Sequence, residues 1–316
     1  MRNPKLPKVI NMDELETKPL NPHRILTLDG GGIKGIFTAV LLRRLNESVP
    51  GFLGRTHMFA GTSTGGILAL ALAAGKHPQQ LINFYRDMGA KVFRDSWWDN
   101  LRDLKGLIGA EYDNKHLEKC LLGVFGEKKL KDVGPVLVPS YALSNGLRQA
   151  RPRFFHNLKG SQDLELYCVD VALRTSAAPL LFPTHQGYID GAVVANNPSM
   201  VALATALDPE RAARNFEDVR LFSVGTGYSP YHIQGDRLDW GVLQWARPLV
   251  KLLMDGSSVM ADYECRQILG GHQYFRLNPM LPDPVGLAAV RKINDLVRWA
   301  EDVDLGEATA WLQAAW

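Results

Sequence analysis

The sequence contains little cysteine. Three residues among 316, Cys120, Cys168 and Cys265, lie far apart, and none belongs to a C-x-x-C pair. An odd and widely spaced set of this kind provides neither a disulfide framework nor a zinc site. We therefore expect a protein of a reducing compartment.

An excess of charge of one sign is also absent. The 36 lysines and arginines are nearly balanced by 33 acidic residues, which leaves a formal net charge of +3. This balance gives no indication of binding to a nucleic-acid polymer, although a mildly basic surface is compatible with anionic lipid. Hydrophobic residues make up 46% of the chain and charged residues 22%. This composition excludes a disordered or fibrous chain and predicts a globular protein.

No stretch of the chain is long and apolar enough to cross a bilayer. The most hydrophobic run, residues 67–74, is less than half of the roughly 20 residues that a spanning helix needs, and it predicts a buried helix. Residues 1–22 mix charges and prolines without the apolar core of a signal peptide, so we interpret them as an N-terminal extension of a cytoplasmic protein. No linker divides residues 23–316, which we expect to form one domain.

Two strand-turn-helix units near the start of the chain predict the fold class. Residues 24–28 and 58–60 are short apolar runs, and each is followed by glycines and then by helical apolar spacing. Such units indicate an α/β protein in three layers, with a mostly parallel sheet flanked by helices. We expect further strands at 135–141, 166–171 and 219–224, and helices over most of 81–122, 238–260 and 285–311. A helix at 198–207 is expected to pack behind residues 188–190.

The second of these turns, Gly61-Thr62-Ser63-Thr64-Gly65, matches the pattern G-x-S-x-G. In this pattern a sharp turn between strand and helix exposes a serine hydroxyl, and its glycines are required because the neighbouring backbone leaves no room for a Cβ atom. Ser63 would lie at a helix N-terminus, which favours developing negative charge. Taken alone, the five residues fit an incidental glycine-rich turn equally well.

The first turn, Asp29-Gly30-Gly31-Gly32-Ile33-Lys34-Gly35, has two interpretations. Three of its glycines fit the G-x-G-x-x-G fingerprint of dinucleotide-binding proteins. That fingerprint requires an acidic residue at the end of a second strand about 20 residues later, whereas Glu47 lies in a helical stretch. Consecutive glycines can also direct several backbone N–H groups at one point, as a tetrahedral oxyanion requires. An oxyanion loop is the better interpretation.

A third element, Asp190-Gly191-Ala192, follows the apolar pair Tyr188-Ile189. An aspartate at the end of a strand can accept a proton from a hydroxyl at a neighbouring strand end. By itself, Asp-Gly is a common turn dipeptide and indicates no function.

Together the three elements resemble the patatin-like phospholipase family, over roughly residues 24–277. The glycine loop, the G-x-S-x-G turn and the D-G-[AG] motif occur in the family's order, and shorter motifs at 176–183, 196–198 and 223–227 agree. The resemblance implies a three-layer fold with a nucleophile elbow. It also implies a catalytic dyad of Ser63 and Asp190. The implied oxyanion loop comprises Gly30, Gly31, Gly32, Ile33, Lys34 and Gly35, where Lys34 replaces the arginine of many members.

The chemistry implied by this resemblance is hydrolysis of fatty-acyl esters of membrane phospholipids. Asp190 would take the proton of Ser63, while N–H groups around Gly31, Gly32 and Ile33 stabilise the oxyanion. A histidine acting after the acid would be His232 or His272, and neither lies in a supporting motif. No cofactor is expected. Calcium is not an expected requirement, because no acidic loop of calcium-binding spacing occurs.

Two apolar segments are candidates for a lid or for contact with the membrane surface. Residues 93–108 combine adjacent tryptophans with amphipathic helical spacing and basic side chains. A second cluster comprises Trp240, Trp245, Leu249, Leu252, Leu253 and Met254. Ordinary core packing explains either segment equally well.

The layout of the chain also resembles the standalone phospholipase effectors of bacterial antiphage systems. That resemblance implies a cyclic dinucleotide activator and action at the inner face of the membrane. Arg148, Arg151 and Arg153 are candidate phosphate contacts, although a solvated loop explains them as well. A constitutive hydrolase and a catalytically silent lipid-binding module are the alternatives, and the intact Ser63, Asp190 and glycine loop favour a hydrolase. The sequence is compatible with a monomer and with a homo-oligomer.

Overall fold

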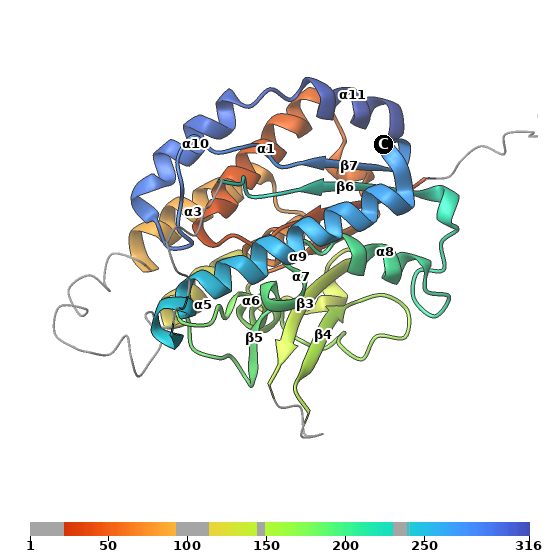
Figure 1. Ribbon diagram of the computed structural model, residues 1–316. Helices are drawn as coiled ribbons and strands as arrows, with labels where there is room; N and C mark the ends of the chain where they lie inside the picture. The colour runs from red at the N-terminus through yellow and green to blue at the C-terminus, as the bar shows by residue number, and fades with distance from the viewer. Residues whose placement is uncertain (1–21, 93–113, 144–148, 230–238, 240) are drawn as a thin grey trace, which may run out of the picture.

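The computed structural model describes residues 22–92, 114–143, 149–229, 239 and 241–316. Within these residues a seven-stranded sheet has the order β4-β3-β2-β1-β6-β7, and β5 pairs with β3 (Figure 1). Its parallel part contains β1 (His23–Leu28), β2 (Met58–Gly61), β3 (Val136–Ala142), β6 (Val219–Val224) and β7 (Tyr274–Leu277). β4 (Arg151–His156) and β5 (Tyr188–Asp190) run antiparallel to β3.

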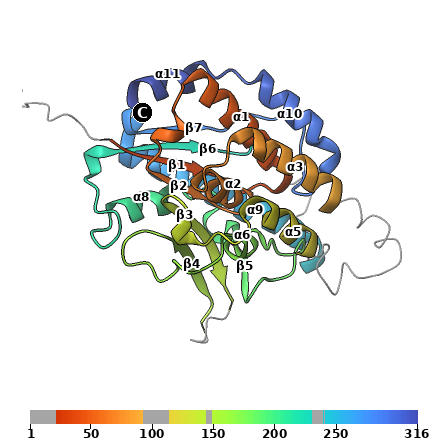
Figure 2. The ribbon, with the colours of Figure 1, turned by 180° about the vertical axis from the view of Figure 1, so that it is seen from behind.

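Helices cover both faces of the sheet and give three layers (Figures 1 and 2). The larger core lies between one face and α1 (Gly35–Ser48), α2 (Thr64–Ala73), α3 (Pro78–Val92), α5 (Asn114–Phe125), α6 (Cys168–Ser176), α10 (Ile293–Asp302) and α11 (Gly306–Ala315). The smaller core lies beneath α8 (Ser199–Leu207) and the long α9 (Val242–Gln273). The short α7 (Ala192–Ala195) follows β5. The expected three-layer α/β fold is thus confirmed.

The central strands and helix α2 form from segments whose side chains are mostly small or apolar on every face. All residues of β2 and β6 are buried, as is usual for parallel strands covered by helices on both faces. Helix α2 is buried from Thr64 to Leu72, because its side chains are small or apolar all round. This helix contains most of the hydrophobic run that the sequence predicts to be buried. Among the described residues, no helix is both long and apolar enough to span a membrane.

Some expectations for individual elements were wrong. Residues 166–171 are not a strand: α6 begins at Cys168, and an acidic residue in its first turn, Asp170, favours the helix N-terminus. Strands β4 and β7 were missed. Helix α8 packs mainly against β1, β6 and α9 rather than behind β5. The whole 93–108 segment, together with Trp240, lies outside the described residues.

Candidate active site

The G-x-S-x-G turn is the sharp connection from β2 to α2. Ser63 has a φ of 55° and a ψ of −123°, a strained conformation for a residue with a side chain. A Cβ atom on Gly61 would lie 2.0 Å from the carbonyl oxygen of Gly65, and one on Gly65 would lie 2.2 Å from that of Leu28. Both positions therefore require glycine, and the turn has the geometry of a nucleophile elbow.

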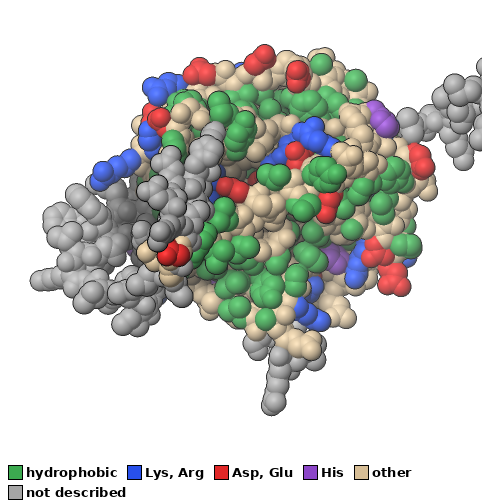
Figure 3. All heavy atoms as spheres, viewed as in Figure 1, with side chains coloured by type: hydrophobic (Ala, Val, Ile, Leu, Met, Phe, Trp, Pro, Cys, Tyr) green, Lys and Arg blue, Asp and Glu red, His purple; other side chains and the backbone are tan. Residues whose placement is uncertain are grey.

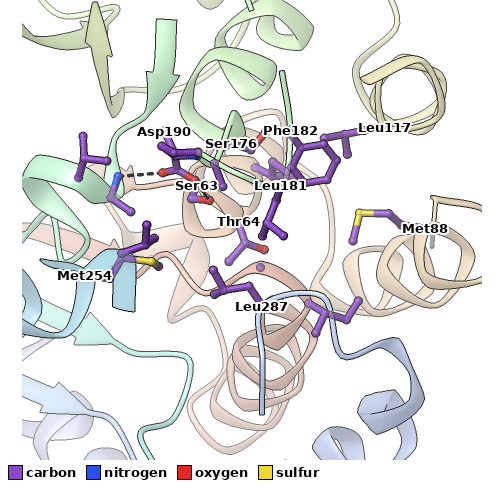
Figure 4. Close-up of a pocket in the computed structure, with 18 of the residues that line it drawn as sticks. Ser63, Thr64, Met88, Leu117, Ser176, Leu181, Phe182, Asp190, Met254 and Leu287 are labelled. Carbon is purple, nitrogen blue, oxygen red and sulfur yellow. Dashed lines mark hydrogen bonds between the residues drawn. The ribbon is translucent and has the colours of Figure 1, made fainter. Parts of the chain in front are cut away.

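Ser63 and Asp190 are brought together although 127 positions separate them. The Ser63 hydroxyl donates a hydrogen bond of 2.6 Å to Oδ2 of Asp190, and the Ala192 N–H donates one of 2.8 Å to Oδ1 (Figure 4). Burial raises the pKa of Asp190 to about 7, against the opposing effect of these two hydrogen bonds. A carboxyl group with such a pKa can accept and return a proton near neutral pH.

Helix α6 supports both members of this pair. The Ser63 N–H donates to Oγ1 of Thr175 at 2.9 Å, and the Thr175 hydroxyl donates to the carbonyl of Pro139 at 2.5 Å. The Asp190 N–H donates to the carbonyl of Ala177 at 2.9 Å. Sequence reasoning missed Thr175. Its one signal was its place directly before the Ser176-Ala177-Ala178-Pro179 motif.

The glycine loop follows β1 and passes beside the serine. A Cβ atom on Gly30 would lie 3.2 Å from Cβ of Ser63. Within the described residues, the N–H groups of Gly31 and Gly32 donate to no acceptor, whereas the Ile33 N–H donates to the carbonyl of Leu287 at 2.8 Å. The expectation that Ile33 offers a free donor to the oxyanion is therefore wrong. The pattern could not show this engagement, because Leu287 comes from a distant part of the chain.

A buried ion pair holds the start of this loop. Arg276 on β7 donates to both carboxylate oxygens of Asp29, at 3.1 and 2.6 Å, and to the Ser223 hydroxyl of β6 at 2.7 Å. The two charged side chains are only 6% and 5% exposed. Burial alone would lower the pKa of Arg276, but the Asp29 carboxylate raises it above its ordinary value. Through these hydrogen bonds the pair ties the end of β1 to the edge strand β7 across β6.

The other charged residue of the loop, Lys34, forms no ion pair with any residue that the structure describes. Its Nζ donates to the carbonyl of Gly227 at 3.4 Å. Burial, followed by the nearby Lys251, lowers the pKa of Lys34 to about 8. The residue is still largely protonated at neutral pH, so the positive charge that the resemblance implied is present beside the loop.

An apolar pocket opens at the serine and the aspartate (Figure 4). Ser63 and Asp190 form part of its wall, and most other lining side chains are aliphatic or aromatic. They include Ile33, Ile67, Tyr85, Met88, Leu117, Leu181, Phe182, Val250, Met254 and Leu287. Such a lining suits a hydrocarbon chain, with the reactive ester held at the polar end.

Part of the second apolar cluster contributes to this pocket. Met254 of α9 lines it, whereas Leu249, Leu252 and Leu253 of the same helix are 48%, 39% and 47% exposed. Hydrophobic side chains gather along the front of the molecule in Figure 3, where α9 crosses it. A role of this cluster as a lid stays a prediction.

The structure describes one of the two histidine candidates, His272, and two of the three arginine candidates, the exposed Arg151 at the start of β4 and Arg153. His272 lies in the last turn of α9, just before β7 begins, and so at the opposite end of the parallel strands from Ser63. Arg153 is ion-paired with Asp163 and lies over the Phe155 ring. His232 and Arg148 lie outside the described residues. No histidine of the described part lines the pocket.

Comparison with known proteins identifies the family. A family model described as patatin-like phospholipase matches residues 26–203. The chain belongs to this family. The match includes the glycine loop, the elbow and Asp190, which meet in the geometry described above.

Similar proteins occur in several bacteria. Protein teg of Priestia megaterium is 30% identical over 84% of this chain and 90% of its own length. Proteins named cGAMP-activated phospholipase are 32% identical in both Vibrio cholerae and Pseudomonas aeruginosa. The first match covers 69% of this chain and 68% of the relative, and the second covers 81% and 78%. As a patatin-like phospholipase with such relatives, the protein is a lipid acyl hydrolase.

The buried ion pair leads to a first prediction. Replacing Arg276 by Gln leaves the Asp29 carboxylate buried without its partner, so the free energy of unfolding should fall by about 3–5 kcal/mol. Arg266→Gln is the matched control, because it removes an exposed ion pair with Asp262 on α9 that contributes at most about 1 kcal/mol. Urea denaturation measures both. Equal losses in the two variants would contradict the assigned role of Arg276.

The raised pKa of Asp190 leads to a second prediction. In the folded protein the Asp190 carboxyl retains its proton up to a pH of about 7. In the unfolded chain the same carboxyl releases its proton near pH 4. Between these pH values the folded state therefore binds more protons than the unfolded state. The stability of the wild type should therefore fall relative to Asp190→Asn as the pH rises from 4 to 7, and the difference should then level off. Urea denaturation across this range tests it, with exposed Asp302→Asn as control. Parallel curves for Asp190→Asn and wild type would refute the prediction.

Proposed function

We propose that the protein cleaves fatty-acyl esters of membrane phospholipids, with Ser63 as nucleophile and Asp190 as base. The observation that carries this proposal is the 2.6 Å hydrogen bond from the Ser63 hydroxyl to the Asp190 carboxylate at the wall of an apolar pocket. The acyl chain would occupy the pocket, and its ester carbon would lie at Ser63.

The first half of the reaction transfers the acyl group to the enzyme. Asp190 accepts the proton of Ser63 while the serine oxygen attacks the ester carbonyl. The free N–H groups of Gly31 and Gly32 stabilise the resulting oxyanion, and the N-terminus of α2 adds a favourable dipole. Asp190 then gives its proton to the departing alcohol oxygen. The products are a lysophospholipid and an acyl-serine.

The second half releases the fatty acid. Asp190 accepts a proton from a water molecule that attacks the acyl-serine, and it returns this proton to Ser63 as the bond breaks. The carboxyl group thus acts alternately as base and acid, which suits a pKa of about 7. A third catalytic residue is not required, because the hydrogen bonds from Ser63 and Ala192 already orient the carboxylate.

We also propose that a cyclic dinucleotide controls this activity in antiphage defence, at the inner face of the membrane. Support comes from the relatives named cGAMP-activated phospholipase in Vibrio cholerae and Pseudomonas aeruginosa. A phospholipase without control would damage the membrane of its own cell. The second candidate is a constitutive lipid acyl hydrolase.

The catalytic proposal predicts that Ser63→Ala abolishes release of fatty acid from phospholipid vesicles. Loss of the nucleophile should reduce the rate by about 10⁴-fold or more, because the remaining groups cannot form the acyl intermediate. Ser229→Ala, which changes a hydroxyl that donates to the Asp283 carbonyl in a surface loop, is the matched control. If Ser63→Ala folds, as judged by circular dichroism, and keeps the wild-type rate, Ser63 is not the nucleophile.

The gating proposal predicts that wild-type activity on vesicles depends on one member of a panel of cyclic dinucleotides that includes cGAMP. The activator should raise the rate of fatty-acid release without affecting Ser63→Ala. Activity that is equal with and without every nucleotide would instead identify a constitutive hydrolase. Absence of activity on phospholipid, combined with binding to vesicles, would favour the silent lipid-binding module.

A further inference from the structure

A group of arginines lies at the N-terminal ends of the parallel strands, opposite to the end that carries the active site. Arg24 is the second residue of β1 and Arg220 the second residue of β6, and the two are direct partners in these adjacent parallel strands. Their side chains therefore project from the same face of the sheet. Arg55 ends η3 (Leu53–Arg55), just before β2, and Arg214 lies in the segment that leads to β6. In Figure 1 this end of the sheet is where the red strand β1 begins.

Two histidines complete this arginine cluster. The rings of His23 and His57 have centroids 5.3 Å apart, and Nδ1 of His57 accepts a hydrogen bond of 3.1 Å from the Arg24 N–H. Burial, then the positive charge of Arg214, lowers the pKa of His23 to about 4. The pKa of His57 is also lowered, first by burial and then by Arg24. Both imidazoles are therefore neutral near pH 7 and can donate or accept hydrogen bonds.

Among the described residues, the nearby Asp218 carboxylate offsets part of the positive charge of this cluster through its effect on Arg220, but it forms no ion pair with the cluster. Within the described residues, none of the four guanidinium groups forms an ion pair with a carboxylate, unlike Arg43, Arg153 or Arg276 elsewhere. In the part of the chain that the structure describes, the Arg220 guanidinium donates to two backbone carbonyls, those of Glu217 and Val219. The nearby Asp218 carboxylate accepts a hydrogen bond from Asn215 instead.

Among the described residues, two polar side-chain atoms of the cluster are also buried without a hydrogen-bond partner. They are Nε of Arg24 and Nε2 of His23, and the His23 side chain belongs to a residue that is only 7% exposed. Buried polar atoms are almost always hydrogen-bonded, so an unpartnered pair beside only partly compensated charge indicates a missing ligand. Guanidinium groups are positively charged hydrogen-bond donors, so the ligand that fits them is an anion that accepts hydrogen bonds.

We propose that this cluster of Arg24, Arg55, Arg214 and Arg220 is a binding site for the phosphate group of an organic phosphate. Guanidinium groups form paired hydrogen bonds with phosphate oxygens more readily than any other side chain. Neighbouring strands lie about 4.8 Å apart, so Arg24 and Arg220 can reach oxygens of one phosphate. The site does not depend on the catalytic proposal. It also differs from Arg153, whose guanidinium is already engaged by Asp163.

Binding of pyrophosphate to the full-length protein tests the site directly. Isothermal titration calorimetry and thermal denaturation would compare the wild type with Arg24→Gln/Arg55→Gln and with Arg86→Gln/Arg298→Gln, a control pair of exposed arginines on α3 and α10. Sodium chloride of equal ionic strength serves as the reference. Two further arms use cGAMP and vesicles that contain phosphatidylinositol 4-phosphate in phosphatidylcholine, because a nucleotide and a lipid headgroup carry the same chemistry.

We expect pyrophosphate to raise the Tm of the wild type and of the control pair. Its affinity should fall by about tenfold or more in Arg24→Gln/Arg55→Gln, since hydrogen bonds to charged groups commonly contribute that factor. Without ligand and at low salt, this variant should melt no lower than the wild type, because repulsion between the arginines is relieved. Binding of cGAMP alone would identify a soluble nucleotide as the source, and binding of the vesicles alone a lipid.

Two results would overturn the proposal. One is the absence of any Tm increase in the wild type with pyrophosphate, cGAMP or the vesicles. The other is an equal increase in all three proteins, which would place the anion elsewhere. Hydrolysis of a soluble ester by the variant is expected at the wild-type rate, so a failure of the catalytic proposal would leave this test unaffected.

Discussion

Close contact between backbone segments at the serine turn is the constraint on which the site depends. Gly61 and Gly65 let β2 fold back into α2, and Gly65 also lies against the carbonyl of Leu28, where β1 ends. Because Asp29 and the glycine loop follow Leu28 directly, the same contact fixes the nucleophile and the free N–H groups relative to each other. Preorganised donors of this kind need no rearrangement when charge develops.

The buried charges at the two ends of the sheet differ in how far neighbouring groups compensate them. At the catalytic end, Asp29 is neutralised by Arg276, and Asp190 reduces the penalty of its burial by holding a proton up to pH of about 7. At the opposite end, within the part of the chain that the structure describes, four arginines lie together without an ion-paired carboxylate, and two buried polar atoms lack hydrogen-bond partners. A folded protein tolerates such repulsion at a cost in stability, which a bound anion would offset.

Local patterns predicted the parts of the site that depend on local geometry. Ser63, Asp190 and the glycine turns were recognisable because a sharp turn between strand and helix restricts the residue type at each step. Thr175, Arg276 and Leu287 were not, because each acts through a contact with a residue more than 100 positions away. Leu287 even removes a donor that the pattern offered, the Ile33 N–H. The 166–171 segment was misread because a short apolar run does not distinguish a strand from a buried helix.

Two strands connect the arginine cluster with the catalytic loop. β1 begins at His23 and Arg24 and continues into Asp29, while β6 carries both Arg220 and Ser223, which accepts a hydrogen bond from Arg276. An anion held between Arg24 and Arg220 would therefore bind the same two strands that position the loop through the Asp29 and Arg276 pair. Physical continuity alone does not produce regulation. An anion can change the catalytic rate only if it binds more tightly to one arrangement of the loop than to another. The equilibrium between the two arrangements then shifts by no more than the ratio of the two affinities.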